Sequence, residues 1–191
     1  KSVLLMALDR WPPVYDADEL AGTIRELVAS ERLFAEFYDD LLQGPPVCQG
    51  DVVRLGSHVP LIDRTGQPVA DFDVDFWLVI GNTCDFERDP VKVPWTQVVP
   101  IFDFSTEGTL SEDEQAALRR YQTSRAFYLP PWRGQPAGSC LVADLCRTVT
   151  AEKAVFDQAA HVVARLREAS WVLLHSCLIR FLCRDDGRFD A

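Results

Sequence analysis

The chain has 191 residues, a length that suits one domain whose core needs neither disulfides nor a metal for stability. Its formal charge of −10 disfavours indiscriminate binding to nucleic acid or to anionic membranes, and a basic partner protein is easier to accommodate. None of the six cysteines stands in Cys-x-x-Cys spacing, so we expect free thiols in a cytoplasmic protein and no zinc site.

The first 46 residues predict one strand and two helices. Residues 1–9 form an apolar run that is too short to cross a membrane or direct export, and we interpret it as a core strand. Asp16 and Glu19 have capping-box spacing at the start of the first helix. Ser30 is placed to cap a second helix, whose apolar residues continue to Leu42 before a Gly-Pro-Pro run ends it.

Residues 50–105 are the strand-rich part of the chain. An apolar strand follows Gly50 and Asp51, and a polar turn separates it from a fully apolar strand over residues 76–80. A third strand is predicted over residues 96–102. Short, strongly apolar strands joined by polar turns are typical of a small, bent β-barrel.

The C-terminal half alternates helices and strands. Ser111 and Glu114 form a capping box for a helix over residues 112–123, and strands follow at 126–129 and from residue 140 towards 149. A short helical turn is expected at 151–156. Apolar residues at helical spacing then predict one long helix over 158–183, which would place His161 and His175 ~21 Å apart.

This order of elements predicts an α+β protein. We expect an SH3-like β-barrel over residues 47–149 with an inserted helix, preceded by the N-terminal strand and helices of residues 1–46. A long C-terminal helix within residues 150–191 would pack on the barrel and complete one compact unit. The chain has no glycine-rich phosphate loop, Gly-x-Ser-x-Gly elbow, His-Glu-x-x-His motif or dinucleotide fingerprint. We therefore predict no cofactor and no metal.

A polar cluster directly follows the apolar strand at 76–80. It consists of Asn82, Thr83, Cys84 and Asp85, and it stands where the chain leaves the core. Such residues either line a binding pocket or form a structural turn in which Asp85 accepts backbone N–H groups. An adjacent carboxylate disfavours the Cys84 thiolate, so a nucleophilic cysteine is only a third possibility.

A second candidate binding surface precedes the same strand. Asp71, Asp73 and Asp75 alternate with apolar residues, so a strand would place all three carboxylates on one face. Like charges on one face usually mark a solvated edge that resists further strand pairing. A metal site is the alternative interpretation. We expect the acidic edge, together with the Asn82–Asp85 cluster, to bind a partner protein that is possibly basic.

Three residues have the chemistry for RNA cleavage. His58 and Asp85 could act as general base and general acid on the 2′-hydroxyl and the leaving oxygen, and Arg54 could stabilise the phosphorane. The sequence does not show whether the barrel brings these three side chains together. A single histidine in a strand is more often a surface residue or a hydrogen-bonded core residue.

Three apolar segments resemble the barrel of MazF/PemK-type toxins. They are Gly-Asp-Val-Val-Arg at residues 50–54, Trp-Leu-Val-Ile-Gly-Asn at 77–82 and Val-Val-Pro-Ile at 98–101. The resemblance implies an SH3-like barrel, metal-independent RNA cleavage and pairing with an antitoxin. The chain is longer and more acidic than these toxins, and no second basic residue accompanies His58. The fold is therefore transferred more readily than the catalysis.

The chain also resembles a group of bacterial proteins with a Val-Ile-x-x-Thr-Cys-Asp signature, found here at residues 79–85. The Phe-Tyr-Leu-Pro-Pro run at 127–131 and the Arg-Phe-Leu-x-Arg run at 180–184 belong to the same resemblance, which implies no particular activity. The sequence thus predicts a non-enzymatic protein-binding module of a bacterial conflict system, namely toxin–antitoxin, immunity or phage defence. The alternative is a divergent MazF/PemK-like endoribonuclease, and only then is nucleic acid a partner.

Overall fold

A computed structural model describes residues 17–39, 42, 47–55, 61–62, 68–69, 74–105, 110–159 and 161–183 of the chain. The strand expected at residues 1–9 and the cap at Asp16 lie outside the described residues. Among the candidate site residues, His58, Asp71 and Asp73 also lie outside them, so their predicted roles stay predictions.

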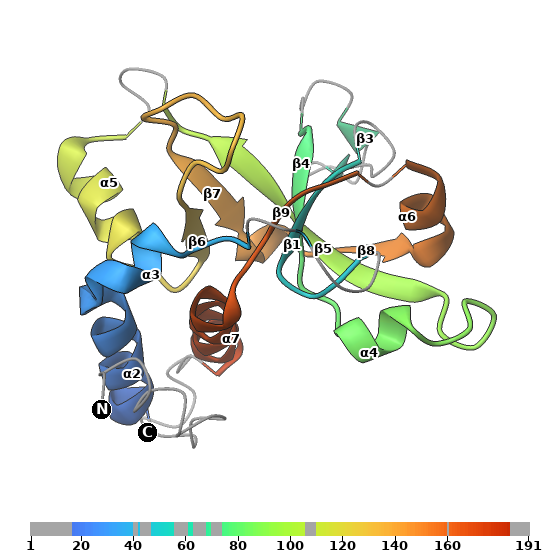
Figure 1. Ribbon diagram of the computed structural model, residues 1–191, viewed down its shortest axis with the longest axis horizontal. Coiled ribbons are helices and arrows are strands. Elements are labelled where there is room, and N and C mark those ends of the chain that lie inside the picture. The colour runs from blue at the N-terminus through green and yellow to red at the C-terminus, as the bar shows by residue number, and fades with distance from the viewer. Residues whose placement is uncertain are drawn as a thin grey trace.

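The fold is mixed helix and sheet, built on an antiparallel sheet that curls into a half-barrel (Figure 1). The strand order is β6-β7-β5-β4-β1-β9, and β8 also pairs with β5. The strands are β1 (Asp51–Arg54), β4 (Phe76–Val79), β5 (Trp95–Asp103), β6 (Ala126–Leu129), β7 (Leu141–Asp144), β8 (Val149–Glu152) and β9 (His161–Arg165). A separate ribbon pairs β2 (Leu61–Ile62) with β3 (Pro68–Val69). The strands predicted at 76–80, 96–102 and 126–129 are confirmed.

Strand β5 holds the two halves of the sheet together. One edge of β5 pairs with β8 over residues 95–98 and with β7 over residues 101–103. The other edge pairs with β4 over residues 98–100. Its N-terminal part therefore lies beside β8, at the end of the molecule that carries α4 (Thr83–Phe86) and α6 (Lys153–Ala159) (Figure 1).

Six α-helices accompany the sheet in the described part of the chain. They are α2 (Ala17–Ala29), α3 (Glu31–Ala35), α4 (Thr83–Phe86), α5 (Glu112–Arg119), α6 (Lys153–Ala159) and α7 (Glu168–Leu182). α2 packs against α7, and α4 and α6 lie at the opposite end of the molecule from α2, α3 and α5 (Figure 1). Ser111 and Glu114 form the predicted capping box of α5. None of the described helices is long and apolar enough to cross a membrane.

Both faces of the sheet are buried, which explains why its central strands are almost continuously apolar. In β1, Val52 belongs to a large core shared with α2, α5 and α7, whereas its neighbour Val53 belongs to a second core. In β4, Leu78 and Trp77 divide in the same way. Phe156 of α6 packs into the second core. Successive side chains on each strand thus support opposite cores.

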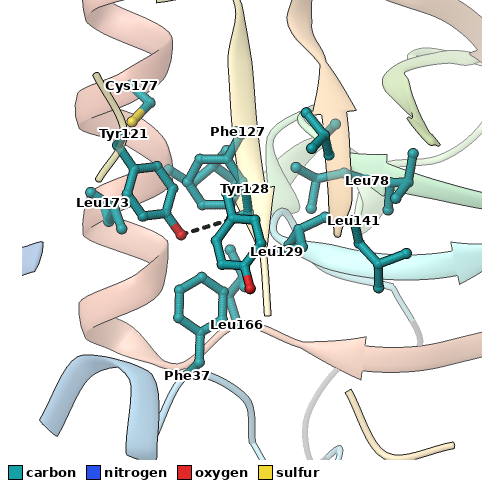
Figure 2. Packing of buried hydrophobic residues seen from close by; sticks show 14 of the residues in the cluster. Phe37, Leu78, Tyr121, Phe127, Tyr128, Leu129, Leu141, Leu166, Leu173 and Cys177 are labelled. Carbon is teal, nitrogen blue, oxygen red and sulfur yellow. Dashed lines mark hydrogen bonds between the residues drawn. The ribbon is translucent and has the colours of Figure 1, made fainter. Parts of the chain in front are cut away.

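Tyr121 joins α5, β6 and α7 inside the large core (Figure 2). Its ring centroid lies 5.2 Å from that of Phe127, and its hydroxyl donates to the carbonyl of Tyr128 at 2.7 Å. The hydroxyl of Tyr38 donates to the carbonyl of Pro130 at 2.6 Å. These two bonds satisfy backbone carbonyls in and just after β6, the strand at one end of the strand order.

We expect the protein to lose stability as the pH rises above about 10, the ordinary tyrosine pKa. Burial raises the pKa of Tyr121 and of Tyr38 well above that value. The folded chain therefore keeps protons that the unfolded chain releases, so the free energy of unfolding falls with rising pH. Urea denaturation at pH 8 and pH 11 measures this fall. It should be smaller in Tyr121→Phe, and an equal fall in both proteins would contradict the assignment.

The long helix predicted over residues 158–183 is wrong. Residues His161–Arg165 form β9, which pairs with β1, and α7 begins only at Glu168. The two valines of β9 fitted helical spacing, but β-branched residues favour strands, and here they cover an edge of the sheet. His161 and His175 therefore lie on different elements, and the ~21 Å expected for one helix does not apply.

The second N-terminal helix is shorter than predicted. α3 ends at Ala35, and Ser30 takes its N-cap position without a side-chain capping hydrogen bond. Beyond α3, Tyr38 forms a β-bridge with Leu166 at the end of β9. Pairing with the sheet therefore replaces the last turns of the expected helix.

Two smaller predictions between β7 and α6 also need correction. The strand predicted from residue 140 does not run on to residue 149, because Asp144 accepts a hydrogen bond from the N–H of Cys146 and caps a 3-10 helix, η2 (Leu145–Arg147). The helical turn predicted at 151–156 begins late, since Ala151 belongs to β8. β8 is therefore a strand of its own, separated from β7 by η2.

A buried ion pair fixes β9 against β1. Nε and Nη2 of Arg165 donate to the two carboxylate oxygens of Asp51 at 2.7 and 2.8 Å, and Asp51 is 0 % exposed. The N–H of Cys48 donates to the same carboxylate at 2.8 Å. Burial raises the pKa of the Asp51 carboxyl, and the hydrogen bonds from Arg165 and Cys48 oppose the rise. The pair sets which residues of the two strands face each other.

Candidate functional site

The polar cluster after β4 forms one turn of helix, α4. Asn82 caps this turn, because its side-chain oxygen accepts a hydrogen bond from the N–H of Cys84 at 3.1 Å. The turn former is thus Asn82 and not Asp85, whose carboxylate pairs with Arg88 at 3.2 Å. Cys84 is exposed on this turn. The local sequence therefore places Asp85 at the surface, just beyond the end of a buried strand.

Gln49 connects this turn to helix α7. Its N–H donates to Oγ1 of Thr83 at 2.9 Å, and its Nε2 donates to the carbonyl of Ile80 at 2.7 Å. Its Oε1 lies 2.9 Å from Nε2 of His175 on α7. Burial lowers the pKa of His175, and the backbone carbonyl of Trp171 opposes that change. Gln49 thereby holds the start of α4 in a fixed position.

A pocket of about 400 Å³ lies beside α4. It brings Asn82 and Asp85, two of the predicted binding residues, together with residues of β5 and β8. The complete lining is Gln49, Ile80, Gly81, Asn82, Asp85, Trp95, Thr96, Gln97 and Thr150. Most of these side chains end in amide, hydroxyl or carboxylate groups. The pocket therefore offers many hydrogen-bonding positions and one aromatic surface.

Trp95 is the aromatic member of the pocket, and 56 % of its surface is exposed. Along β5, Trp95 and Gln97 are exposed, and Thr96 between them is buried. On β8, Thr150 lies opposite Gln97, Glu152 lies opposite Trp95, and both are exposed. One face of the β5–β8 ribbon therefore presents a tryptophan to solvent. A large apolar side chain that is exposed beside a pocket indicates an interaction site.

Lys153, the first residue of α6, anchors the loop that follows α4. Its side chain is almost completely covered, with 3 % exposed, and its Nζ donates to the backbone carbonyls of Asp85 and Arg88. Lysine is rarely buried to this extent without such partners. This tether keeps the wall that carries Asp85 close to β8 and α6.

The structure does not bring Arg54 and Asp85 together. Arg54 lies opposite Phe76 at the start of β4, whereas Asp85 follows the far end of that strand. The four residues of β4 alone span ~10 Å. Arg54 pairs instead with Asp75 at 3.2 Å, with both side chains exposed. His58, the third member of the predicted ribonuclease set, lies outside the described residues.

Asp75 is the member of the expected acidic edge that the structure describes. It stands immediately before β4, and its carboxylate accepts a hydrogen bond from Arg54. Within the described ranges, no group of three or more His, Cys, Asp or Glu side chains is arranged to hold a metal ion. Asp71 and Asp73 lie outside those ranges, so the metal alternative for Asp71, Asp73 and Asp75 stays a prediction.

Sequence reasoning located one wall of the pocket and missed the other. Trp95 lies outside the strand predicted over residues 96–102, and Gln97 lies within it but is not among the predicted site residues. The sequence Trp-Thr-Gln-Val carries no alternation of apolar and polar residues that marks this face, since the tryptophan is exposed and the threonine is buried. Gln49 and Thr150 carry no local pattern that distinguishes them, since only the tertiary fold brings them to α4.

We expect Gly81→Ala to destabilise the protein by about 1 to 3 kcal/mol. A Cβ at this position would lie 2.1 Å from Oγ1 of Thr96 and 3.0 Å from the backbone nitrogen of Gln97. Gly22, in the middle of α2, has nothing within 4 Å of an added Cβ. Gly22→Ala should therefore raise the free energy of unfolding by about 0.5 to 1 kcal/mol. Urea denaturation compares the two variants, and changes of the same sign would refute the assigned packing.

Comparison with models of protein families, with curated proteins and with solved structures finds no match for this chain. The resemblance to MazF/PemK-type toxins therefore stays an expectation drawn from short sequence segments. The function has to be argued from the geometry of the pocket and of the sheet face beside it.

Proposed function

We propose that this chain is a non-enzymatic protein-binding module whose docking site is the pocket beside α4 and the exposed face of β5 and β8. The observation that carries the proposal is Trp95, which is mostly exposed and lines a pocket of polar groups. Tryptophan is among the residues that dominate binding energy at protein interfaces. Such residues are typically surrounded by polar groups at the rim, as Trp95 is by Gln97, Thr150 and Asp85.

The fixed geometry of the pocket supports the same proposal. Asn82 caps α4, Gln49 holds the start of this turn, and Lys153 anchors the loop after it. A site that is already ordered loses less conformational entropy on association than a flexible one. These tethers come from three different parts of the chain, and all of them act on the wall that carries Asp85.

The setting expected from the sequence is part of this proposal: an SH3-like barrel that acts in the cytoplasm within a bacterial conflict system. The curled antiparallel sheet supports the barrel, and the six free cysteines support a reducing compartment. The separation of Arg54 from Asp85 along β4 favours binding over the ribonuclease alternative.

Trp95→Ala is expected to weaken partner binding by about 30-fold or more, which corresponds to ~2 kcal/mol. The tagged full chain is used to capture its partner from a lysate of the source organism, and mass spectrometry identifies the captured protein. Calorimetry with the purified partner then compares wild type and variant. The truncation removes an interface anchor without removing core packing, so the fold should persist.

Phe34→Ala is the matched control for this experiment. Phe34 is also a partly exposed aromatic residue, but it belongs to α3, which lies at the opposite end of the molecule from α4 (Figure 1). It lines a second pocket of about 370 Å³. The proposal predicts unchanged affinity for Phe34→Ala. Equal weakening in the two variants, or full affinity in Trp95→Ala, would contradict the assigned site.

A further inference from the structure

Two acidic residues, Asp85 and Glu152, are neighbours of Trp95. Asp85 lines the same pocket as Trp95, and Glu152 lies directly opposite Trp95 in the β5–β8 register. Directly opposite residues in an antiparallel pair have Cβ atoms about 5 Å apart, so the Glu152 side chain adjoins the indole. A cation placed on the face of Trp95 would therefore meet both the ring quadrupole and nearby negative charge.

One buried polar atom of a pocket-lining residue has no hydrogen-bond partner within the described part of the chain. Thr96 is 5 % exposed, and its Oγ1 makes no hydrogen bond to any described residue. A buried hydroxyl without a partner is costly, and nearly all such groups in native proteins are satisfied. Gly81 leaves room for this hydroxyl, because a Cβ at that position would overlap it. In the alternation of β5 the Thr96 side chain lies on the face opposite to Trp95 and Gln97, so its hydroxyl belongs to the wall behind the pocket and not to the open acceptors.

The chain already shows which group suits the carboxylate of the pocket. Nη1 of Arg88 lies 3.2 Å from Asp85, and both side chains are exposed to solvent. An exposed ion pair three residues apart contributes little to stability. The Arg88 side chain can therefore leave Asp85 at small cost when another guanidinium approaches from a partner.

We propose that the pocket beside α4 accepts an arginine side chain of the partner, stacked on Trp95 and paired with Asp85 in place of Arg88. This inference rests on the proposed function and names the chemistry of the partner's anchor. The net charge of −10 also favours a basic partner segment, because opposite charges attract each other.

Arginine fits this pocket better than lysine for geometric reasons. Its planar guanidinium presents five donors in a fixed arrangement and stacks on aromatic rings, whereas an ammonium is a compact, strongly hydrated charge. The pocket offers acceptors in several directions, from the carboxylate of Asp85, the hydroxyl of Thr150 and the amide of Gln97. A planar group with several donors can use more of these acceptors at once.

The test titrates the full chain with three acetylated, amidated tripeptides, Gly-Arg-Gly, Gly-Lys-Gly and Gly-citrulline-Gly. The indole N–H resonance of Trp95, identified by its loss in Trp95→Ala, reports binding in the pocket. We expect saturable shifts with the arginine peptide, weaker binding of the lysine peptide, and no saturable shift with neutral citrulline. Citrulline keeps the shape of arginine without its charge, so equal binding of citrulline would overturn the inference.

Two arginine variants make the test specific to Asp85. Arg88→Ala should bind the arginine peptide roughly two- to fivefold more tightly, because it removes the competing guanidinium. Arg32→Ala removes the same charge from an exposed ion pair with Glu36 on the other side of the molecule, and its affinity should not change. An equal gain in both variants would show that only overall charge matters and would overturn the inference.

Failure of this inference is distinguishable from failure of the proposed function. If no peptide shifts the Trp95 resonance but the captured partner still requires Trp95, the docking site stands and the arginine anchor is rejected. If the partner binds Trp95→Ala as well as wild type, the proposed function itself is rejected.

Discussion

Arg165→Met is expected to lower the free energy of unfolding by about 3 to 5 kcal/mol. Methionine keeps much of the length and apolar stem of arginine but removes the charge that pairs with Asp51. The carboxylate of Asp51 is fully buried and accepts two hydrogen bonds from Arg165. Once this partner is gone, the chain must bury an unpaired charge or protonate the carboxyl, and both outcomes destabilise the folded state.

The loss of stability should come from leaving one charge of the Asp51–Arg165 pair without its partner. Asp51→Asn combined with Arg165→Met should cost less than the sum of the two single changes, because the double variant leaves no unpaired buried charge. Arg54→Met is the matched control at the other end of β1. Its pair with Asp75 is exposed, so its loss should cost no more than about 1 kcal/mol. Urea denaturation compares the four variants with the wild type, and similar losses for Arg165→Met and Arg54→Met would contradict the account.

The second large effect is expected from Lys153→Met, at about 2 to 3 kcal/mol. The buried ammonium donates to the carbonyls of Asp85 and Arg88, and methionine can fill the space without donating. The loop after α4 should then detach from α6. Because the same ammonium also holds the backbone of Asp85 in α4, partner binding should weaken although Lys153 itself is not in the pocket lining.

Lys92→Met separates the tether from a general effect of charge. Lys92 lies in the same connection between α4 and β5 but is exposed. Its replacement changes the net charge by the same amount and should leave both stability and partner binding almost unchanged. If Lys153→Met retained wild-type stability, the tether would have no energetic role. If it lost stability but kept full partner affinity, the pocket would not depend on the position of α4.

The central strands were predictable because a strand that is buried on both faces is a continuous run of apolar residues. Residues 76–80 are continuously apolar since alternate side chains support different cores, with Trp77 in one and Leu78 in the other. The capping box at Ser111 was predictable for a different reason, because its hydrogen bonds are entirely local. Burial on both faces made the strand predictable, and local hydrogen bonds made the helix start predictable.

The segment that became β9 could not be assigned from sequence. Its valines are compatible with both helical and extended spacing over so short a run. What decides the outcome is distant in the chain: the edge of β1 needs a partner, and Arg165 needs the carboxylate of Asp51. Neither requirement is visible within residues 158–183.

The candidate site was half predictable for the same reasons. Asn82 and Asp85 stand at the end of a strongly apolar strand, and that position alone marked them. Gln49 and Thr150 belong to the pocket only because the sheet curls and brings their segments to α4. The exposed face of β5 was not predictable, because Trp95 is apolar but exposed and Thr96 is polar but buried.

Hydrogen exchange of the full chain, alone and bound to its captured partner, tests the docking site most directly. The account predicts slower amide exchange on binding in residues 81–86, 95–97 and 149–152, which form or adjoin the pocket beside α4. Exchange near the second pocket, in residues 34–39 and 130–133, should stay the same. Protection confined to the second pocket, with no change around α4 and the start of β5, would contradict the account.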